Sequence, residues 1–135
     1  MNLPYKLIVI DDYESNNLLC RIIIRQTLGK NQEVATFTSV TDALSFIKNS
    51  YDHTESPLKT ILFLDINMPD LSGWETLEIL NTLDESIRRQ LIVYILSSSI
   101  DPKDKARAKT QSMVKDFIEK PLTALKLEQI FENLS

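Results

Sequence analysis

The stretch Ile61-Leu62-Phe63-Leu64, followed directly by Asp65, decides the fold class of this chain. A strand that is apolar at every position is buried on both faces, which is typical of a parallel sheet covered by helices on each side. Two further runs, residues 7–10 and 91–96, have the same apolar composition. We therefore predict a parallel sheet with helices on both of its faces.

Five predicted strands alternate with five predicted helices. The two remaining strands are expected at residues 33–37 and 114–118. The helices are indicated by capping residues and by apolar residues three and four positions apart. In chain order these signals are Leu18, Leu19, Ile22 and Ile23 before Gly29; Ser39 and Asp42 with Ala43, Leu44 and Ile47; Ser72 and Glu75 with Leu77 and Leu80; Asp101 with Pro102; and Leu127, Ile130, Phe131 and Leu134.

This repeated strand–helix order predicts a doubly wound α/β fold, because right-handed crossovers place successive helices on the two faces of one sheet. The 135 residues correspond to one domain, residues 1–135. The polar segment at residues 49–59 is expected to be a surface loop.

Composition excludes several classes of protein. Fifteen Lys and Arg against 19 Asp and Glu give a net charge of −4, which disfavours a general nucleic-acid binder. The single cysteine, Cys20, cannot form an intrachain disulfide, and no apolar run is long enough to span a membrane. With no signal peptide visible, we expect a cytoplasmic protein with neither nucleic-acid nor membrane partners.

Acidic residues follow two of the predicted strands. Asp11 and Asp12 end the first strand, and Asp65 ends the third. The carboxyl ends of parallel strands form one edge of the sheet, where ligands bind in this class of fold. A single aspartate there is usually a turn or cap residue, but capping does not account for all three. Clustered carboxylates repel one another unless a cation intervenes, and a purely oxygen ligand set favours Mg²⁺.

Two other kinds of site can be tested on the same edge. A flavin-phosphate site after the first strand is disfavoured, because Asp11 and Asp12 would repel the phosphate. A phosphatase of the haloacid-dehalogenase type resembles this site in its strand-end aspartate, but needs a second aspartate two residues later. That position is Asn67.

Four motifs together carry a resemblance to a known family. They are Ile8-Val9-Ile10-Asp11-Asp12, Leu62-Phe63-Leu64-Asp65-Ile66-Asn67-Met68-Pro69 with Gly73 following, Ile95-Leu96-Ser97-Ser98, and Phe117-Ile118-Glu119-Lys120-Pro121. In this order, and over nearly the whole chain, the sequence resembles a receiver domain of a two-component response regulator. The resemblance implies a flavodoxin-like fold with strand order 2-1-3-4-5. Because no output segment follows, the chain looks like the stand-alone, chemotaxis-regulator-like receivers.

The resemblance implies that Asp65 is the phosphoacceptor, which receives a phosphoryl group from a histidine kinase or a histidine phosphotransfer protein. It implies a Mg²⁺ ion bound directly by Asp12, through water by Asp11, and also by Asp65 and the backbone carbonyl of Asn67. Lys120 would pair with Asp65 and then with the phosphoryl group.

The remaining roles that the resemblance implies concern the switch. Ser97 would contact the phosphoryl group through its hydroxyl, and Phe117 would change rotamer in response. Pro121 would follow a cis peptide bond. This chain departs from the family pattern in having Ser97 where threonine is commoner, and Phe117 lacks the hydroxyl of the tyrosine found in other receivers.

We therefore expect a phosphorylation-dependent switch that acts on an unidentified output partner and is not an enzyme for a diffusible substrate. Two alternatives stay open: an interaction module that signals without phosphate, and a phosphatase that uses Asp65. Several other residues have simpler interpretations. Cys20 is expected to pack in the core, Trp74 to pack at the start of a helix, and His53 to be exposed. The basic residues at 103, 105, 107 and 109 are expected to form a solvated face, with partner docking as a less favoured role.

Overall fold

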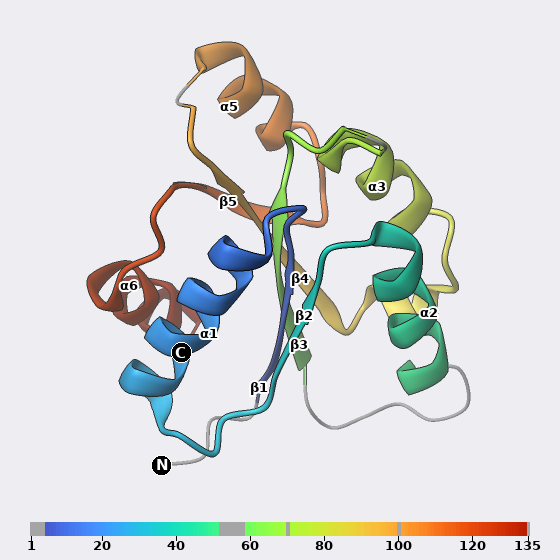
Figure 1. The fold of residues 1–135 in the computed structure, drawn as a ribbon. Helices are drawn as coiled ribbons and strands as arrows, with labels where there is room; N and C mark the ends of the chain where they lie inside the picture. Colours follow the sequence, from blue (N-terminus) through green and yellow to red (C-terminus); the bar gives the residue numbers. More distant parts are fainter. Residues whose placement is uncertain (1–4, 52–58, 70, 100, 135) are drawn as a thin grey trace.

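A computed structural model describes residues 5–51, 59–69, 71–99 and 101–134. Its centre is a five-stranded parallel sheet with the strand order β2-β1-β3-β4-β5 (Figure 1). The strands are β1 (Tyr5–Ile10), β2 (Val34–Phe37), β3 (Lys59–Asp65), β4 (Leu91–Ser97) and β5 (Val114–Glu119). The predicted fold class and strand order are confirmed, and each strand lies within two residues of its predicted bounds.

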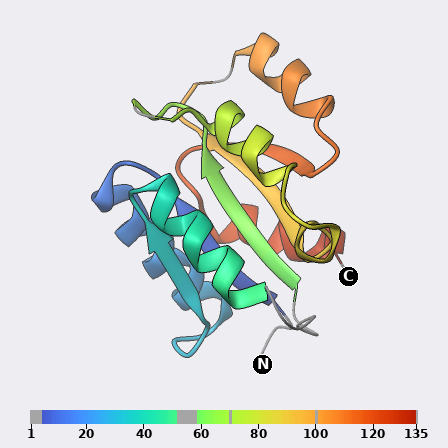
Figure 2. The same ribbon diagram turned by 90° about the vertical axis from the view of Figure 1, so that its right-hand side faces the viewer.

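The described residues form six helices around the sheet. They are α1 (Glu14–Leu28), α2 (Val40–Tyr51), α3 (Gly73–Leu80), α4 (Glu85–Arg88), α5 (Pro102–Lys109) and α6 (Ala124–Leu134). Helices α1 and α6 lie on one side of the sheet, and α2 and α3 lie on the other (Figures 1 and 2). The four-residue helix α4 was not predicted, because one helical turn is too short to show a periodic pattern. Among the described residues, no helix combines the length and apolar character needed to cross a membrane.

The strands divide the core into two layers. In β1, Leu7 and Val9 pack in the cluster with α1 and α6, whereas Ile8 and Ile10 pack in the cluster with α2 and α3. All four side chains are at most 2% exposed. Alternate residues of a strand point to opposite faces, so a strand covered on both sides must be apolar throughout. This arrangement explains the apolar runs from which the fold was predicted.

Capping signals correctly located three helix starts. Ser72 and Glu75 form a complete capping box at α3, and the side chain of Asp101 accepts a hydrogen bond from the backbone N–H of Lys103 at α5. Ser39 likewise accepts from the N–H of Asp42 at α2. These side chains satisfy backbone donors that a helix cannot satisfy internally.

Of the four apolar residues that predicted α1, only Ile23 packs against the core, where it is partly buried. Leu18, Leu19 and Ile22 are 54%, 56% and 41% exposed, whereas the buried residues of this helix are Asn17, Cys20 and Ile24. The buried positions have the expected helical spacing, but one of them is polar, so a search for apolar residues selected the neighbouring face. Cys20 does pack in the core, as predicted, and burial raises the pKa of its thiol to about 11.

The polar segment at 49–59 is only partly as predicted. Helix α2 extends to Tyr51 and β3 begins at Lys59, so both ends of the expected loop belong to regular elements. His53 and the other residues at 52–58 lie outside the described residues.

Gly73 is required by a close approach of two backbone segments. A Cβ atom at this position would lie 2.6 Å from the Cα of Ile66 and 2.7 Å from the carbonyl oxygen of Asp65. The N–H of Gly73 also donates to the carbonyl of Ile66 at 3.2 Å. The start of α3 thus packs directly against the end of β3, which fixes the backbone that carries Asp65.

Candidate functional site

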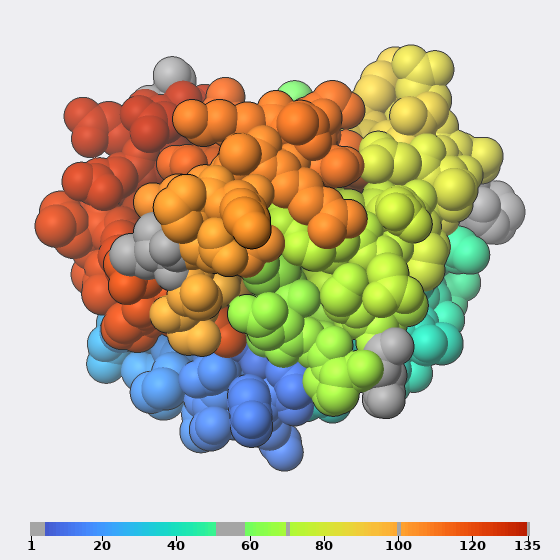
Figure 3. Space-filling view, turned by 90° about the horizontal axis from the view of Figure 1, so that it is seen from above, coloured from blue at the N-terminus to red at the C-terminus, as the bar shows by residue number. Residues whose placement is uncertain are grey.

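Three carboxylates meet at the carboxyl edge of the sheet. Asp11 and Asp12 follow β1 directly, Asp65 is the last residue of β3, and the two strands are paired in register up to Ile10 and Leu64. One ligand oxygen from each aspartate lies within 4.8 Å of the others. Viewed from this edge, the blue residues that follow β1 border the green residues that follow β3 (Figure 3). The structure therefore brings together the three acidic residues selected from the sequence.

Lys120 supplies a positive charge to this cluster. Its Nζ lies 2.7 Å from Oδ2 of Asp11 and 3.5 Å from Oδ2 of Asp65. Burial lowers the pKa of Lys120, but its hydrogen bond and charge contacts with Asp11 and its attraction to Asp65 outweigh this, so the pKa is raised overall. The expected pairing with Asp65 is present, but Asp11 is the closer partner. The peptide bond between Lys120 and Pro121 is cis, the isomer that the resemblance implied.

The single positive charge of Lys120 does not fully neutralise the negative charges of the three carboxylates. Burial raises the pKa of Asp65, and the charges of Asp11 and Asp12 raise it further, against the lowering effects of the Asn67 N–H and of Lys120. Oδ1 of Asp12 is buried and has no hydrogen-bond partner among the described residues. A buried acceptor without a partner is costly, and a bound cation would relieve that cost.

The side-chain atoms of this cluster that could coordinate a metal are all carboxylate oxygens. Such ligands fit a hard divalent cation such as Mg²⁺. The backbone N–H of Asn67 donates to Oδ1 of Asp65 at 3.0 Å, which holds the turn after β3 against the cluster. Metal coordination by the carbonyl of Asn67 stays a prediction.

Ser97 lies on β4, the strand next to β3, and Phe117 lies on β5, the strand beyond it. Ser97 is the last residue of β4 and is fully buried; its Oγ accepts the N–H of Ser99 at 3.2 Å. Its carbonyl oxygen accepts the N–H of Lys120 at 2.7 Å. Phe117 is half-buried on β5, where it packs against the core cluster that includes α2 and α3. Ser97 thus contacts both the loop after β4 and the loop that carries Lys120.

Asn17 is a site residue that the sequence analysis missed. It is 3% exposed, and its Nδ2 donates to the carbonyl oxygens of Asp11 at 3.0 Å and Phe37 at 3.2 Å. The N–H of Asp11 donates to the same Phe37 carbonyl at 3.0 Å. Asn17 therefore ties the backbone of the Asp11–Asp12 turn to the end of β2. Its signal in the sequence was a polar residue three positions before Cys20 and seven before Ile24, on the face that proves to be buried.

Trp74 packs at the start of α3, and the basic residues of α5 form an exposed face, as predicted. The ring of Trp74 is partly buried, and Cζ of Arg107 lies 4.5 Å from its centroid, which is a cation–π contact between α3 and α5. The other basic residues of α5, Lys103, Lys105 and Lys109, are exposed.

Comparison with known proteins gives consistent matches. The family model described as "Response regulator receiver domain" matches residues 7–132. A two-component response regulator from Cytophaga hutchinsonii superposes with a TM-score of 0.83 at 31% identity, over 96% of each chain. A response regulator receiver protein from Dyadobacter fermentans superposes with a TM-score of 0.83 at 22% identity, also over 96% of each chain.

Among curated proteins, the sensory/regulatory protein RpfC of Xanthomonas campestris pv. campestris is 26% identical over 130 residues. That alignment covers 96% of this chain but only 16% of the length of RpfC. The similarity to RpfC is therefore limited to one segment of a much longer protein.

We predict that Asn17→Ala destabilises the protein by about 1–3 kcal/mol, because the Asp11 carbonyl loses a buried donor and the Phe37 carbonyl loses one of its two donors. Mg²⁺ affinity should also fall, by about tenfold, because the turn that carries Asp11 and Asp12 is no longer braced. Chemical denaturation and Mg²⁺ titration measure the two effects. Asn16→Ala is the matched control, because its side chain is half-buried and makes no hydrogen bond recorded among the described residues. Equal effects of the two substitutions would contradict the bracing role.

We also predict that Asp12→Ala stabilises the protein in EDTA, because it removes one of three repelling carboxylates together with an unpartnered buried oxygen. The same change should weaken Mg²⁺ binding by about tenfold or more. Thermal melts with and without Mg²⁺ measure both effects. Asp104→Ala on α5 removes an equal charge outside the cluster and should change neither property in this way. A clear loss of stability for Asp12→Ala in EDTA would mean that Asp12 has a structural role.

Proposed function

We propose that this chain, which belongs to the family of response regulator receiver domains, accepts a phosphoryl group on Asp65 in a Mg²⁺-dependent reaction and thereby changes its affinity for a partner protein. The observation that carries the proposal is the convergence of Asp11, Asp12 and Asp65 with the ammonium of Lys120. A scaffold that only had to fold would not need three mutually repelling carboxylates, two of which are almost fully buried.

The proposed donor is a phosphohistidine on a histidine kinase or a histidine phosphotransfer protein. A carboxylate oxygen of Asp65 attacks the phosphorus atom, a new O–P bond forms, and the P–N bond breaks with its electron pair returning to the imidazole nitrogen. The product is an aspartyl phosphate and a free histidine.

Residues of this chain orient the reaction. The N–H of Asn67 holds Oδ1 of Asp65 at 3.0 Å, which leaves the second oxygen, Oδ2, on the side of Lys120. The ammonium of Lys120, within reach of both Asp11 and Asp65, would stabilise the negative charge on the transferred phosphoryl oxygens. A bound Mg²⁺, held by Asp12, Asp65, the Asn67 carbonyl and, through water, Asp11, would supply further neutralisation of that charge.

Ser97 supports the transmission of the signal. Its Oγ already accepts the N–H of Ser99, so its own O–H remains available to donate to a phosphoryl oxygen. Such a bond would move the loop after β4 toward the site and open space for Phe117 on the neighbouring strand. A partner that binds one position of the Phe117 ring more tightly than the other would then detect the phosphate.

The two alternative functions make different demands. A phosphatase that used Asp65 would turn over a diffusible phosphomonoester, but its second aspartate is absent because Asn67 stands there. We propose that the chain acts on no diffusible substrate and promotes only its own phosphorylation and dephosphorylation. An interaction module that signals without phosphate would bind its partner equally well with and without a small phosphodonor.

We predict that the wild-type chain gains one phosphoryl group from a small phosphodonor in the presence of Mg²⁺, and that Asp65→Asn gains none. Intact-mass measurement detects the label, and EDTA should prevent it in the wild type. Asp116→Asn, the same substitution at an exposed position on β5, should leave labelling unchanged. A labelled Asp65→Asn variant or an unlabelled wild type would show that the phosphoacceptor is wrongly assigned.

We predict that Ser97→Ala leaves phosphorylation of Asp65 largely intact but uncouples it from the Phe117 face. Beryllofluoride, a phosphoryl mimic, should cause backbone chemical-shift changes that reach Phe117 in the wild type and stop short of it in the variant. Ser98→Ala, at the adjacent exposed hydroxyl, should behave like the wild type. The same pattern of shifts in Ser97→Ala and in the wild type would remove Ser97 from the coupling.

A further inference from the structure

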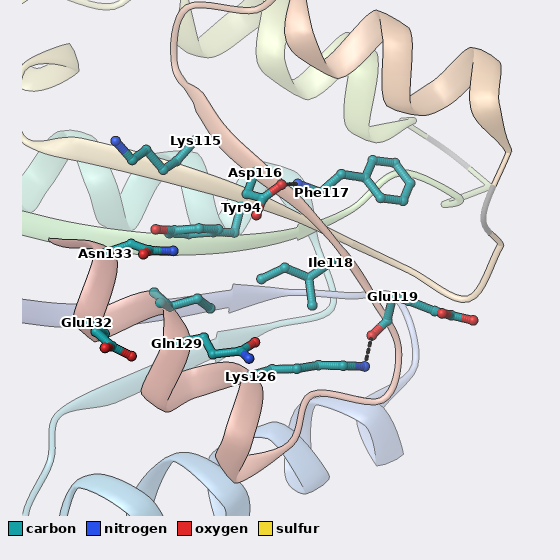
Figure 4. Close-up of a pocket in the computed structure, with 11 residues that line it drawn as sticks. Tyr94, Lys115, Asp116, Phe117, Ile118, Glu119, Lys126, Gln129, Glu132 and Asn133 are labelled. Atoms are coloured by element: carbon teal, nitrogen blue, oxygen red, sulfur yellow. Dashed lines mark hydrogen bonds between the residues drawn. The ribbon is translucent and has the colours of Figure 1, made fainter.

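The backbone on both sides of Lys120 is held by a second lysine. Nζ of Lys126, in the first turn of α6, donates to the carbonyl oxygen of Glu119 at 2.6 Å and to that of Pro121 at 3.0 Å. Figure 4 shows the extended Lys126 side chain reaching back from α6 to Glu119. One ammonium therefore bridges the residue before Lys120 and the residue after it.

A lysine is an unusual choice at this position. Thr123 precedes α6, and its Oγ1 accepts the N–H of Lys126 at 3.2 Å, so Lys126 occupies the third position of the helix. A capping box has Glu or Gln there, and the helix dipole favours an acidic residue in the first turn. Helix α3 of this chain has that arrangement with Ser72 and Glu75, whereas α6 has no acidic residue in its first turn. The two carbonyl contacts give the lysine at position 126 a role that offsets the unfavourable dipole.

The position of the Lys120 ammonium is sensitive to this backbone. Its Nζ lies between two carboxylates, 2.7 Å from Asp11 and 3.5 Å from Asp65, so a small displacement of the loop changes which one it neutralises. The N–H of Lys120 is already anchored to the carbonyl of Ser97 at 2.7 Å. That anchor fixes one point of the loop, and the Lys126 bridge fixes the carbonyls on either side of it.

We infer that Lys126 is a positioning residue, whose ammonium holds the Glu119 and Pro121 carbonyls and thereby places Lys120 between Asp11 and Asp65. The inference deepens the proposed function and rests on it for its effect on phosphoryl transfer. Lys126 itself contacts the loop backbone and not the carboxylates, so it acts through Lys120.

Three variants test this role. Lys126→Met removes both contacts and keeps the length of the side chain, Lys126→Arg keeps a cation with several donors, and Lys115→Met is the matched control. Lys115 is an exposed lysine on β5 that lines the same groove of about 470 Å³ between β5 and α6 (Figure 4). Removing it changes the net charge equally and breaks no hydrogen bond that the structure records.

The experiment measures three properties of the whole chain. The rate of phosphorylation by a small phosphodonor should fall about tenfold in Lys126→Met, because a misplaced catalytic group loses much of its effect. Mg²⁺ affinity, which depends on the carboxylates, should stay within about twofold of the wild type, since the loop that carries Asp11 and Asp12 is untouched. The side-chain ammonium signal of Lys120, followed by ¹⁵N NMR without phosphodonor, should show faster hydrogen exchange because its contact with Asp11 is loosened. Lys126→Arg should restore the rate and the protection, and Lys115→Met should change none of the three.

The outcomes separate this inference from the proposed function. An unphosphorylated wild type would overturn the proposed function, while the Lys120 ammonium signal would still test the placement of Lys120. A wild-type rate and wild-type ammonium signal in Lys126→Met would overturn the inference alone. A parallel loss of Mg²⁺ affinity and rate, without rescue by arginine, would assign Lys126 to general stability and would also overturn it.

Discussion

The mutual repulsion of Asp11, Asp12 and Asp65 is the constraint on which the rest of this structure depends. Like charges this close, with two of the residues almost fully buried, favour any movement that separates them. The fold resists that movement from both sides of the cluster. Strands β1 and β3, which lead into the aspartates, are paired from Tyr5 and Lys59 to Ile10 and Leu64. From Leu7 and Thr60 onward their residues are buried, so neither strand can shift without opening the core.

The loops at the carboxyl edge need separate restraints, because the core does not reach them. Gly73 lets α3 close onto the backbone of Asp65, and Asn17 ties the turn that carries Asp11 to the end of β2. The carbonyl of Ser97 holds the N–H of Lys120. Each of these contacts acts on the backbone next to a charged residue and uses none of the charged atoms themselves. This is the arrangement that a preorganised electrostatic site requires.

Much of this architecture could be predicted from the sequence, because the strongest signals are those that the core imposes. Apolar strands with an aspartate at the end located the sheet and the acidic cluster, and Ser72 with Glu75 located the start of α3. The face of α1 could not be predicted in the same way. Its buried positions include Asn17, whose side chain donates to the carbonyls of Asp11 and Phe37, six and 20 residues away, and no periodic pattern reveals such partners. The closer pairing of Lys120 with Asp11, at 2.7 Å, than with Asp65, at 3.5 Å, likewise rests on a difference of less than an ångström, which the order of residues does not encode.

The same contacts indicate which element would be displaced most easily by a change in charge at the cluster. Ser97 joins two loops, through its Oγ to the N–H of Ser99 and through its carbonyl to the N–H of Lys120.

The loop after β4 leads into α5, a helix that the structure describes in full and in which Ala108 is the one buried residue. A helix with so little apolar burial has a low cost of displacement compared with α1, α2 or α6, which bury several apolar residues each in the two core clusters. Its link to α3 is the stacking of Arg107 on Trp74, a contact worth about 1 kcal/mol at an exposed site. If Ser97 donates to a phosphoryl group, as proposed, a contact of about 1.5–3 kcal/mol would be comparable to what holds α5 and small beside what holds the sheet. The sheet with α1, α2 and α6 thus holds the charges together, whereas α5 is held by much less apolar burial.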